Sequence, residues 1–326
     1  MVFLFLINIS LGAVAIPLKE VCKSLIGAGA SKSSWEYIIM DYRLPKAIVA
    51  ILVGGGLAIS GLLMQTLFRN PLAGPYVLGL SSGASLGVAL VILGSAFLPN
   101  FAGDLVLSSY GIVIASSLGS LVVLLAVLAV AQRLRDTMAI LIVGLMFGSL
   151  TNALVGTLSY FSTAEQLQKF TFWSLGTLGN LSWTSVIILS VCVLIGLVLS
   201  LISVKPLNTL LLGENYAKSL GLNYAKARFV IILATSILAG SITAFAGPIA
   251  FVGLAVPHIA KLVFKTSNHL ILFWSTVLFG AMIMLLCDSI SQLPNSAIVI
   301  PINAITSILG APIVIWLLIR KRKMMS

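Results

Sequence analysis

Residues 45–67 read PKAIVAILVGGGLAISGLLMQTL, a stretch in which Lys46 is the only charged side chain. A helix of this length rises about 35 Å at 1.5 Å per residue, enough to cross a hydrocarbon core of roughly 30 Å. The strands of an outer-membrane barrel alternate apolar and polar residues over about ten positions, and this stretch does not. It therefore predicts a transmembrane helix.

The composition extends this prediction to the whole chain. Of its 326 residues, 60% are apolar and 8% are charged, whereas an ordinary globular protein carries roughly 25% charged residues. A soluble chain with this ratio could not cover its surface, but a chain in lipid needs no polar cover. We therefore predict an all-α integral membrane protein, which excludes secreted disulfide scaffolds, coiled coils, disordered tails and soluble dehydrogenases.

Polar interruptions divide the chain into ten apolar runs, which predict about ten helices in a compact bundle and one transmembrane domain over residues 1–326. An even number places both termini on one side. In the first run, residues 13–15 resemble a signal-peptidase site, but no Lys or Arg precedes the apolar core, so a true first helix is preferred over a signal peptide. That helix begins at Met1 without a cytoplasmic lead, which leaves a start codon upstream as an open alternative. The runs lie near residues 2–17, 45–67, 77–98, 109–131, 138–160, 184–204, 228–246, 247–265, 270–290 and 301–319.

The charges divide unevenly between the two sides that ten helices would define. With the C-terminus inside, the inner segments hold thirteen Lys and Arg residues and two acids, and the outer segments hold six of each. The whole net charge of +11 then lies on the inner side, as expected when cytoplasmic loops are positive. This distribution predicts a cytoplasmic C-terminus and explains the charge without a nucleic-acid partner.

Metal-binding motifs are absent from the sequence. There is no HExxH motif, and Cys22, Cys192 and Cys287 form no CxxC pair. Asp288 could act as an intramembrane acid, but capping or pairing at the outer end of the ninth run is the preferred interpretation. His258 follows a proline and is interpreted as a packing residue.

Small residues recur at a spacing of four, which lets helices approach closely in lipid. They predict three packing faces, formed by Gly79, Gly83 and Gly87, by Gly111, Ala115 and Gly119, and by Gly144 and Gly148.

Two similar motifs, AGPYVLGL (73–80) and AGPIAFVGL (246–254), each come just before a predicted helix, and the predicted topology places them on opposite sides of the membrane. Such a pair is what an inverted repeat would leave, and it predicts pseudo-symmetric halves over residues 45–160 and 228–320. A transporter is therefore favoured.

Residues 205–227 form the longest predicted cytoplasmic loop. A plain connector is the simpler interpretation, but a charged helix bounded by glycines is more than a turn needs, so a docking element for a cytoplasmic partner is preferred. The segment from Gly213 to Ser219 imitates a phosphate-binding loop, yet Ala217 stands where glycine is required, and ATP binding by this chain is excluded. The apolar side chains of the loop are Leu210, Leu211, Leu212, Tyr216, Ala217 and Leu220.

Five blocks resemble the permease subunits of binding-protein-dependent ABC importers for iron–siderophores, haem and cobalamin, the FecCD-like family. The resemblance implies a bacterial cytoplasmic (inner) membrane protein with ten helices, a second permease subunit that is either identical or a paralogue, two cytoplasmic ATPase subunits and a periplasmic binding protein. It implies no cofactor on this chain, since the ATPases hydrolyse the ATP. The blocks are RLPK (43–46), LFRNPLAGPYVLGLSSGASLG (67–87), LLLGENYAKSLGL (210–222), GPIAFVGLAVPHIAKL (247–262) and GAPIVIWLL (310–318).

The resemblance also implies roles for single positions. Arg43 and Lys46 match basic positions that receive acidic residues of the binding protein, and we expect both to project at the membrane surface. A further basic position before the tenth helix is Gln292 here, which departs from the pattern. A gate is implied at Asp136, Thr137 and Met138. Coupling to the ATPases is implied at Leu212, Gly213, Glu214, Ala217, Leu220 and Gly221.

Two other classes compete with this interpretation. An ATP-independent secondary transporter would usually need more ionisable groups at mid-depth, and a polytopic membrane enzyme would need a catalytic constellation. The resemblance favours neither, and it does not distinguish among the chelates.

Overall fold

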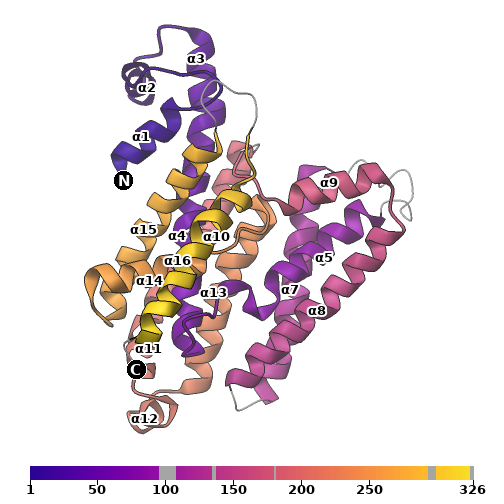
Figure 1. The fold of residues 1–326 in the computed structure, drawn as a ribbon, viewed down its shortest axis with the longest axis vertical. Helices are drawn as coiled ribbons and strands as arrows, with labels where there is room; N and C mark the ends of the chain where they lie inside the picture. Colours follow the sequence, from indigo (N-terminus) through magenta and orange to yellow (C-terminus); the bar gives the residue numbers. More distant parts are fainter. Residues whose placement is uncertain (95–107, 134–136, 180, 293–298, 324–326) are drawn as a thin grey trace.

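The computed structural model describes residues 1–94, 108–133, 137–179, 181–292 and 299–323. Every regular element in these ranges is a helix (Figure 1), so the predicted all-α fold is confirmed. Six described helices are long and apolar enough to cross a membrane. The helices that fall on the ten predicted runs are α1 (Val2–Ser10), α4 (Leu44–Leu67), α5 (Leu80–Ile92), α7 (Ser109–Arg133), α8 (Thr137–Tyr160), α10 (Trp183–Ile202), α13 (Tyr224–Ala246), α14 (Val252–Phe264), α15 (His269–Ser291) and α16 (Ile302–Lys323).

Short helices and turns connect these spans. We name the two ends of the molecule after them: α2 and α3 lie at one end, the α2 end, and α12 lies at the other, the α12 end (Figure 1). The connecting elements are α2 (Leu18–Leu25), α3 (Ser33–Tyr37), the π-helical turn Ile38–Arg43, the 3-10 turn Pro75–Leu78, α9 (Ala164–Ser174), α11 (Val204–Leu210) and α12 (Glu214–Ser219).

The first apolar run differs from its prediction. It was expected to form one helix over residues 2–17, but α1 ends at Ser10, and Gly12 follows with a φ of 143°. That conformation suits glycine, and it turns the chain out of the helix. Residues 11–17 then lead to α2.

Helix α4 forms the centre of the bundle. The 18-residue apolar window within it is 83% buried, more than in any other described span, and α4 packs against α10, α13, α14 and α15. Two glycines allow the closest approaches: a β-carbon on Gly54 would overlap the carbonyl of Gly280, and one on Gly61 would overlap that of Gly253. Helices in lipid associate through such close backbone contact.

The predicted small-residue faces pack against one another. A β-carbon on Gly83 would lie 2.6 Å from the carbonyl oxygen of Gly119, and one on Gly87 would overlap Ala115. These contacts join α5 to α7. Gly79, which has a φ of 74°, packs against the backbone of α8. The three faces therefore hold α5, α7 and α8 together as a group, on the right in Figure 1.

The two AGP motifs meet inside the bundle. Each precedes a helix of 13 residues, α5 or α14, which rises only about 20 Å. The Tyr76 hydroxyl accepts a hydrogen bond from the Ile249 N–H (3.3 Å), and Asn303 Oδ1 accepts one from the Ala250 N–H (3.0 Å). Side chains thus satisfy non-helical backbone that lipid could not. The pseudo-symmetric halves stay a prediction.

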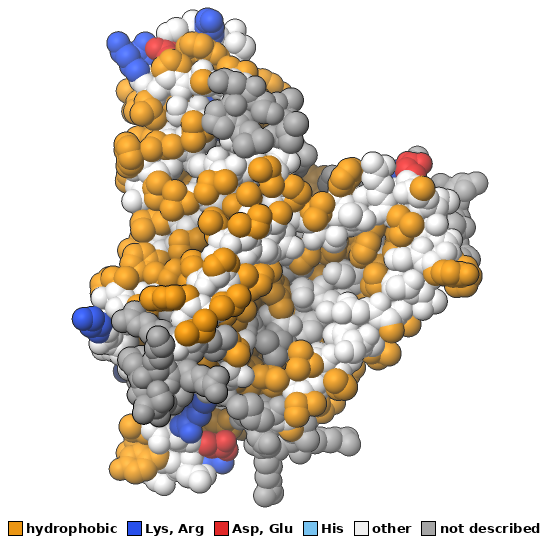
Figure 2. Space-filling model, viewed as in Figure 1, with side chains coloured by type: hydrophobic (Ala, Val, Ile, Leu, Met, Phe, Trp, Pro, Cys, Tyr) orange, Lys and Arg blue, Asp and Glu red, His pale blue; other side chains and the backbone are white. Residues whose placement is uncertain are grey.

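The surface follows the membrane prediction. Figure 2 shows apolar side chains over the middle of the visible face, with most of the visible charged side chains gathered toward its extremities. A bilayer around the middle would therefore leave most of these charges in water.

Candidate functional sites at the two ends of the bundle

The loop at the α12 end is built from two short helices rather than one. Helix α11 ends at Leu210, and Gly213, with φ 112° and ψ 152°, precedes α12. Residues with a β-carbon rarely adopt that conformation, so glycine is required there. Gly221, with a φ of 85°, follows α12. Within α12, Lys218 Nζ lies 2.7 Å from Glu214 Oε1. We call residues 211–222 the α12 loop.

The α12 loop exposes apolar side chains beside charged ones. The exposed fractions are 61% for Leu212, 61% for Tyr216 and 60% for Leu220, while Ala217 is buried. Exposed apolar side chains beside charged ones are typical of surfaces that contact another protein. The docking of a partner here, and the roles of the individual residues, stay predictions.

At the α2 end, Arg43 is buried instead of projecting from the surface. Its guanidinium donates hydrogen bonds to the carbonyls of Ile9 (2.8 Å), Ser10 (2.9 Å) and Val14. These carbonyls lie at and beyond the C-terminus of α1, where helical partners are missing. The expectation that Arg43 projects at the membrane surface is wrong, because the end of α1 folds over it.

Lys46 makes an ion pair with Asp288, on α15. Lys46 Nζ lies 2.9 Å from Asp288 Oδ1, and the side chains are 18% and 2% exposed. Asp288 Oδ2 also accepts hydrogen bonds from Asn8 Nδ2 (2.9 Å) and Gln292 Nε2 (2.7 Å). A buried carboxylate persists only with such partners. The pairing predicted for Asp288 is confirmed, and Gln292 joins the same cluster. We call Asn8, Lys46, Asp288 and Gln292 the Asp288 cluster.

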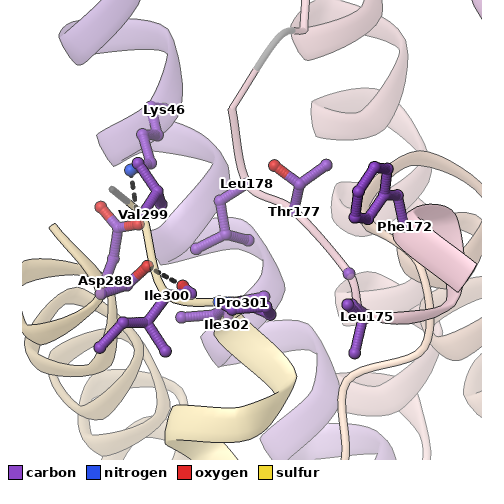
Figure 3. Close-up of a pocket in the computed structure, with 12 residues that line it drawn as sticks. Lys46, Phe172, Leu175, Thr177, Leu178, Asp288, Val299, Ile300, Pro301 and Ile302 are labelled. Atoms are coloured by element: carbon purple, nitrogen blue, oxygen red, sulfur yellow. Dashed lines mark hydrogen bonds and ion pairs between the residues drawn. The ribbon is translucent and has the colours of Figure 1, made fainter. Parts of the chain in front are cut away.

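Two clefts flank Lys46. One, of about 270 Å³, has Lys46 and Asp288 on one side and Phe172, Leu175 and Thr177 on the other (Figure 3). The second, of about 410 Å³, runs between Lys46, Asp41 and the segment before α10. In Figure 3 the Lys46 and Asp288 side chains point toward each other, with Leu178 close by. Lys46 is therefore reached from two openings while it remains paired.

Other predicted residues lie apart from both sites. Asp136 falls outside the described residues; Thr137 and Met138 begin α8, and their side chains are not among those described. His258 packs as expected, with Nε2 2.9 Å from the Pro71 carbonyl oxygen. The described residues contain no group of three His, Cys, Asp or Glu placed to hold a metal ion.

Comparison with known proteins identifies the family to which this chain belongs. Residues 1–320 match the model of the FecCD transport family. The chain belongs to the FecCD transport family. Its members are transport subunits of ABC importers, and a separate subunit hydrolyses the ATP.

Named relatives of this FecCD-family chain cover it almost completely. The hemin transport system permease protein HmuU of Yersinia pestis is 33% identical over 100% of this chain and 95% of its own length. The vitamin B12 import system permease protein BtuC of Escherichia coli is 37% identical over 88% of this chain and 85% of its own length.

Solved structures agree with the fold of this FecCD-family chain. A structure described as an inward-facing metal-chelate type ABC transporter has a TM-score of 0.84 at 29% identity, covering 98% of this chain and 96% of the other. PsaBC from Streptococcus pneumoniae, at 17% identity and a TM-score of 0.58, covers 92% and 94% and shares the fold alone.

The sequence identified Arg43 and Lys46 of this FecCD-family chain as candidate site residues, but it did not predict which groups they bind. Arg43 binds carbonyls more than 25 positions away, and Lys46 pairs across 242 positions. No local spacing carries such contacts. The signal that existed was Asp288 itself, because an acid near a membrane interior needs a cation.

Proposed function

We propose that this chain is the permease subunit of an ATP-driven importer in the bacterial inner membrane, with its C-terminus in the cytoplasm. Its substrate is an iron chelate (a siderophore complex or haem) or cobalamin, delivered by a periplasmic binding protein. The observation that carries the proposal is the match of residues 1–320 to one transport family. The similarity to hemin and vitamin B12 permeases supports this substrate class.

The α12 loop is the proposed contact with an ATPase subunit. Leu212, Tyr216 and Leu220 supply the apolar surface, and Ala217 supports it from below. Gly213 and Gly221 set the angle at which α12 leaves the bundle, and the Glu214–Lys218 pair stiffens it. ATP-driven closure of the two ATPases would move this surface.

The exposed surface of helix α8 is the argument for a second permease subunit that would share a transport path with this chain. It is the least buried of the six described spans, and it exposes Ser149 and Asn152 near its middle. Polar side chains at that depth are costly against lipid, so they face another subunit or water. The second subunit is either a copy of this chain or a paralogue. Two residues of the proposed gate, Thr137 and Met138, are the first residues of the same helix.

Docking of the binding protein is proposed at the α2 end. There Lys46, between its two clefts, is one cation that an incoming carboxylate can reach. Arg43 contributes by fixing α1 beneath the surface rather than by contact, because its donors are occupied by backbone carbonyls.

Co-purification and labelled uptake test the proposal. The chain, expressed with the ATPase and binding protein encoded beside it, should co-purify with the ATPase. Cells should then accumulate radiolabelled haem, a ferric siderophore or cyanocobalamin, supplied one at a time. A cysteine at Asn215 should be protected from impermeant reagents in intact cells. Uptake that is unaffected when the ATPase is deleted would favour a secondary transporter instead.

A further inference from the structure

Helix α11, which leads into the α12 loop, is hydrogen-bonded to the start of α15. Asn208 Oδ1 accepts from the backbone N–H of His269 (2.9 Å) and from its ring Nδ1 (2.8 Å). A backbone N–H can only donate, so the oxygen of the Asn208 amide must face α15. His269 is the first residue of α15 and is 1% exposed. One side chain on α11 thus accepts two hydrogen bonds from the first residue of α15.

The other ring nitrogen of His269 reaches α4. Because the Asn208 oxygen only accepts, Nδ1 carries a proton. The other nitrogen, Nε2, lies 2.9 Å from the hydroxyl oxygen of Thr66, in the last turn of α4, which is 7% exposed. The same hydroxyl lies 2.9 Å from the Leu62 carbonyl oxygen within α4, so in the neutral ring its one proton is shared between two acceptors. A single buried histidine therefore connects α11 to α4 as well as to α15.

A third contact closes the ring of helices. Arg69, just beyond α4, donates from Nη2 to the carbonyl oxygen of Leu210 (2.8 Å), the last residue of α11. Gly213 lies against the same guanidinium, because a β-carbon there would come within 3.1 Å of Nη2. Helices α4, α11 and α15 are thus tied in a closed triangle directly beside the α12 loop.

Helices α4 and α15 carry these ties to the opposite end of the molecule. They run antiparallel, pack through Gly54 and Gly280, and at the α2 end are joined again by the Lys46–Asp288 pair. The pair of helices is therefore fastened at both ends and closely packed between them. A well-packed pair of this kind moves as one body rather than bending.

We infer that Asn208, His269 and Thr66 form the joint through which movement of the α12 loop reaches the α4–α15 pair, and with it the Asp288 cluster. The inference rests on the proposed function, because it needs an ATPase at the α12 loop. These are positioning residues: they contact neither ATP nor substrate. Without the joint, α11 would keep only its Arg69 contact with α4, and less of the movement of α12 would reach α4 and α15.

The test measures uptake per ATP hydrolysed in proteoliposomes that hold the complete transporter, with the radiolabelled chelate that the wild type accumulates. Asn208→Leu removes the accepting oxygen at similar volume, and we expect the ratio to fall about tenfold while hydrolysis continues. Asn208→Asp retains an acceptor and should restore most of the ratio. Thr209→Leu is the matched control, because the Thr209 hydroxyl donates to the Lys205 carbonyl of its own helix.

Two further variants keep the outcomes distinct. If Asn208→Leu fails to assemble, Thr66→Val cuts the α4 arm of the joint with almost no change of shape, and the ratio must fall there. An assembled Asn208→Leu or Thr66→Val transporter with the wild-type ratio would overturn the joint. Leu220→Asp tests the docking surface separately: loss of uptake there alone leaves the proposed function standing without the joint, and normal uptake there removes the proposed ATPase contact at the α12 loop.

Discussion

The two ends of this molecule treat their functional side chains in opposite ways. At the α12 end, Leu212, Tyr216 and Leu220 are exposed on a short helix whose ion pair is internal. At the α2 end, Arg43 and Asp288 are buried, and their charged groups bind partners on neighbouring helices. The first end has an exposed apolar surface, whereas the second is an assembled structural cluster. The position of a charged motif in a sequence therefore does not tell whether it is a contact surface or a support.

The largest expected effect is at the α12 loop. Leu220→Asp places a charge in the surface proposed to enter an ATPase, where an unpaired charge costs several kcal/mol if it is buried. Uptake should be abolished, while membrane insertion and thermal unfolding stay as in the wild type, since Leu220 is exposed. Asn215→Asp, which adds the same charge without removing an apolar side chain, is the control and should retain measurable uptake. Equal loss in both variants would point to charge alone.

Removal of the carboxylate at the α2 end should cost stability rather than docking. Asp288→Asn leaves Lys46 without its anion, and we expect a loss of roughly 2 kcal/mol, below the 3–5 kcal/mol of a fully buried pair because Lys46 retains some solvent contact. Thermal unfolding in detergent measures it. The double variant Asp288→Asn, Lys46→Met removes both charges and should recover part of the loss. No recovery would show that the pair is not the source of the stability.

Arg43 should matter for α1 and little for the rest of the bundle. Arg43→Gln removes charge-assisted hydrogen bonds to three carbonyls, which we expect to cost about 1–2 kcal/mol. Amide hydrogen exchange in residues 2–10 should accelerate, while exchange in α13 stays unchanged. Arg43→Lys, with a compact donor in place of the planar fork, should give an intermediate rate. Uniform acceleration across both helices would contradict a local role.

The smallest expected effect depends on pH and concerns the segment that covers the α2 end. Hydrogen bonds from the Ser31 hydroxyl and N–H, and then from Lys23, lower the pKa of Glu20 to about 2. Because the folded pKa lies below the ordinary value of 4.5, the stabilisation is complete above pH 4.5 and is lost as the pH falls toward 2. The difference in unfolding midpoint between wild type and Glu20→Gln should shrink over that range. A constant difference would exclude ionisation of Glu20 as its cause.

Much of the bundle could be predicted because its determinants are local. Apolar runs locate the spans, and the spacing of Gly79, Gly83 and Gly87 locates a face that does pack closely. The amphipathic pattern around Tyr216 and Leu220 likewise locates an exposed surface. Each of these features depends on residues within a few turns of one another.

The predictions that failed concern residues whose partners are distant in the sequence. The end of α1 at Ser10 is stabilised by Arg43, and the burial of Arg43 depends in turn on α1 folding over it. The Asn208–His269 contact joins residues 61 positions apart, with no periodicity to indicate it. Sequence alone identifies such side chains as polar and well placed, but only the packing of the helices determines what they bind.

The central claim, that ATP hydrolysis by a partner at the α12 loop drives uptake through this chain, has one direct test. The purified chain is reconstituted into vesicles with and without its ATPase, with the binding protein and radiolabelled chelate on the opposite side of the membrane from ATP. The account predicts accumulation only with both the ATPase and ATP present, and its loss in Leu220→Asp. Accumulation by the chain alone, driven by a proton or sodium gradient, would contradict it.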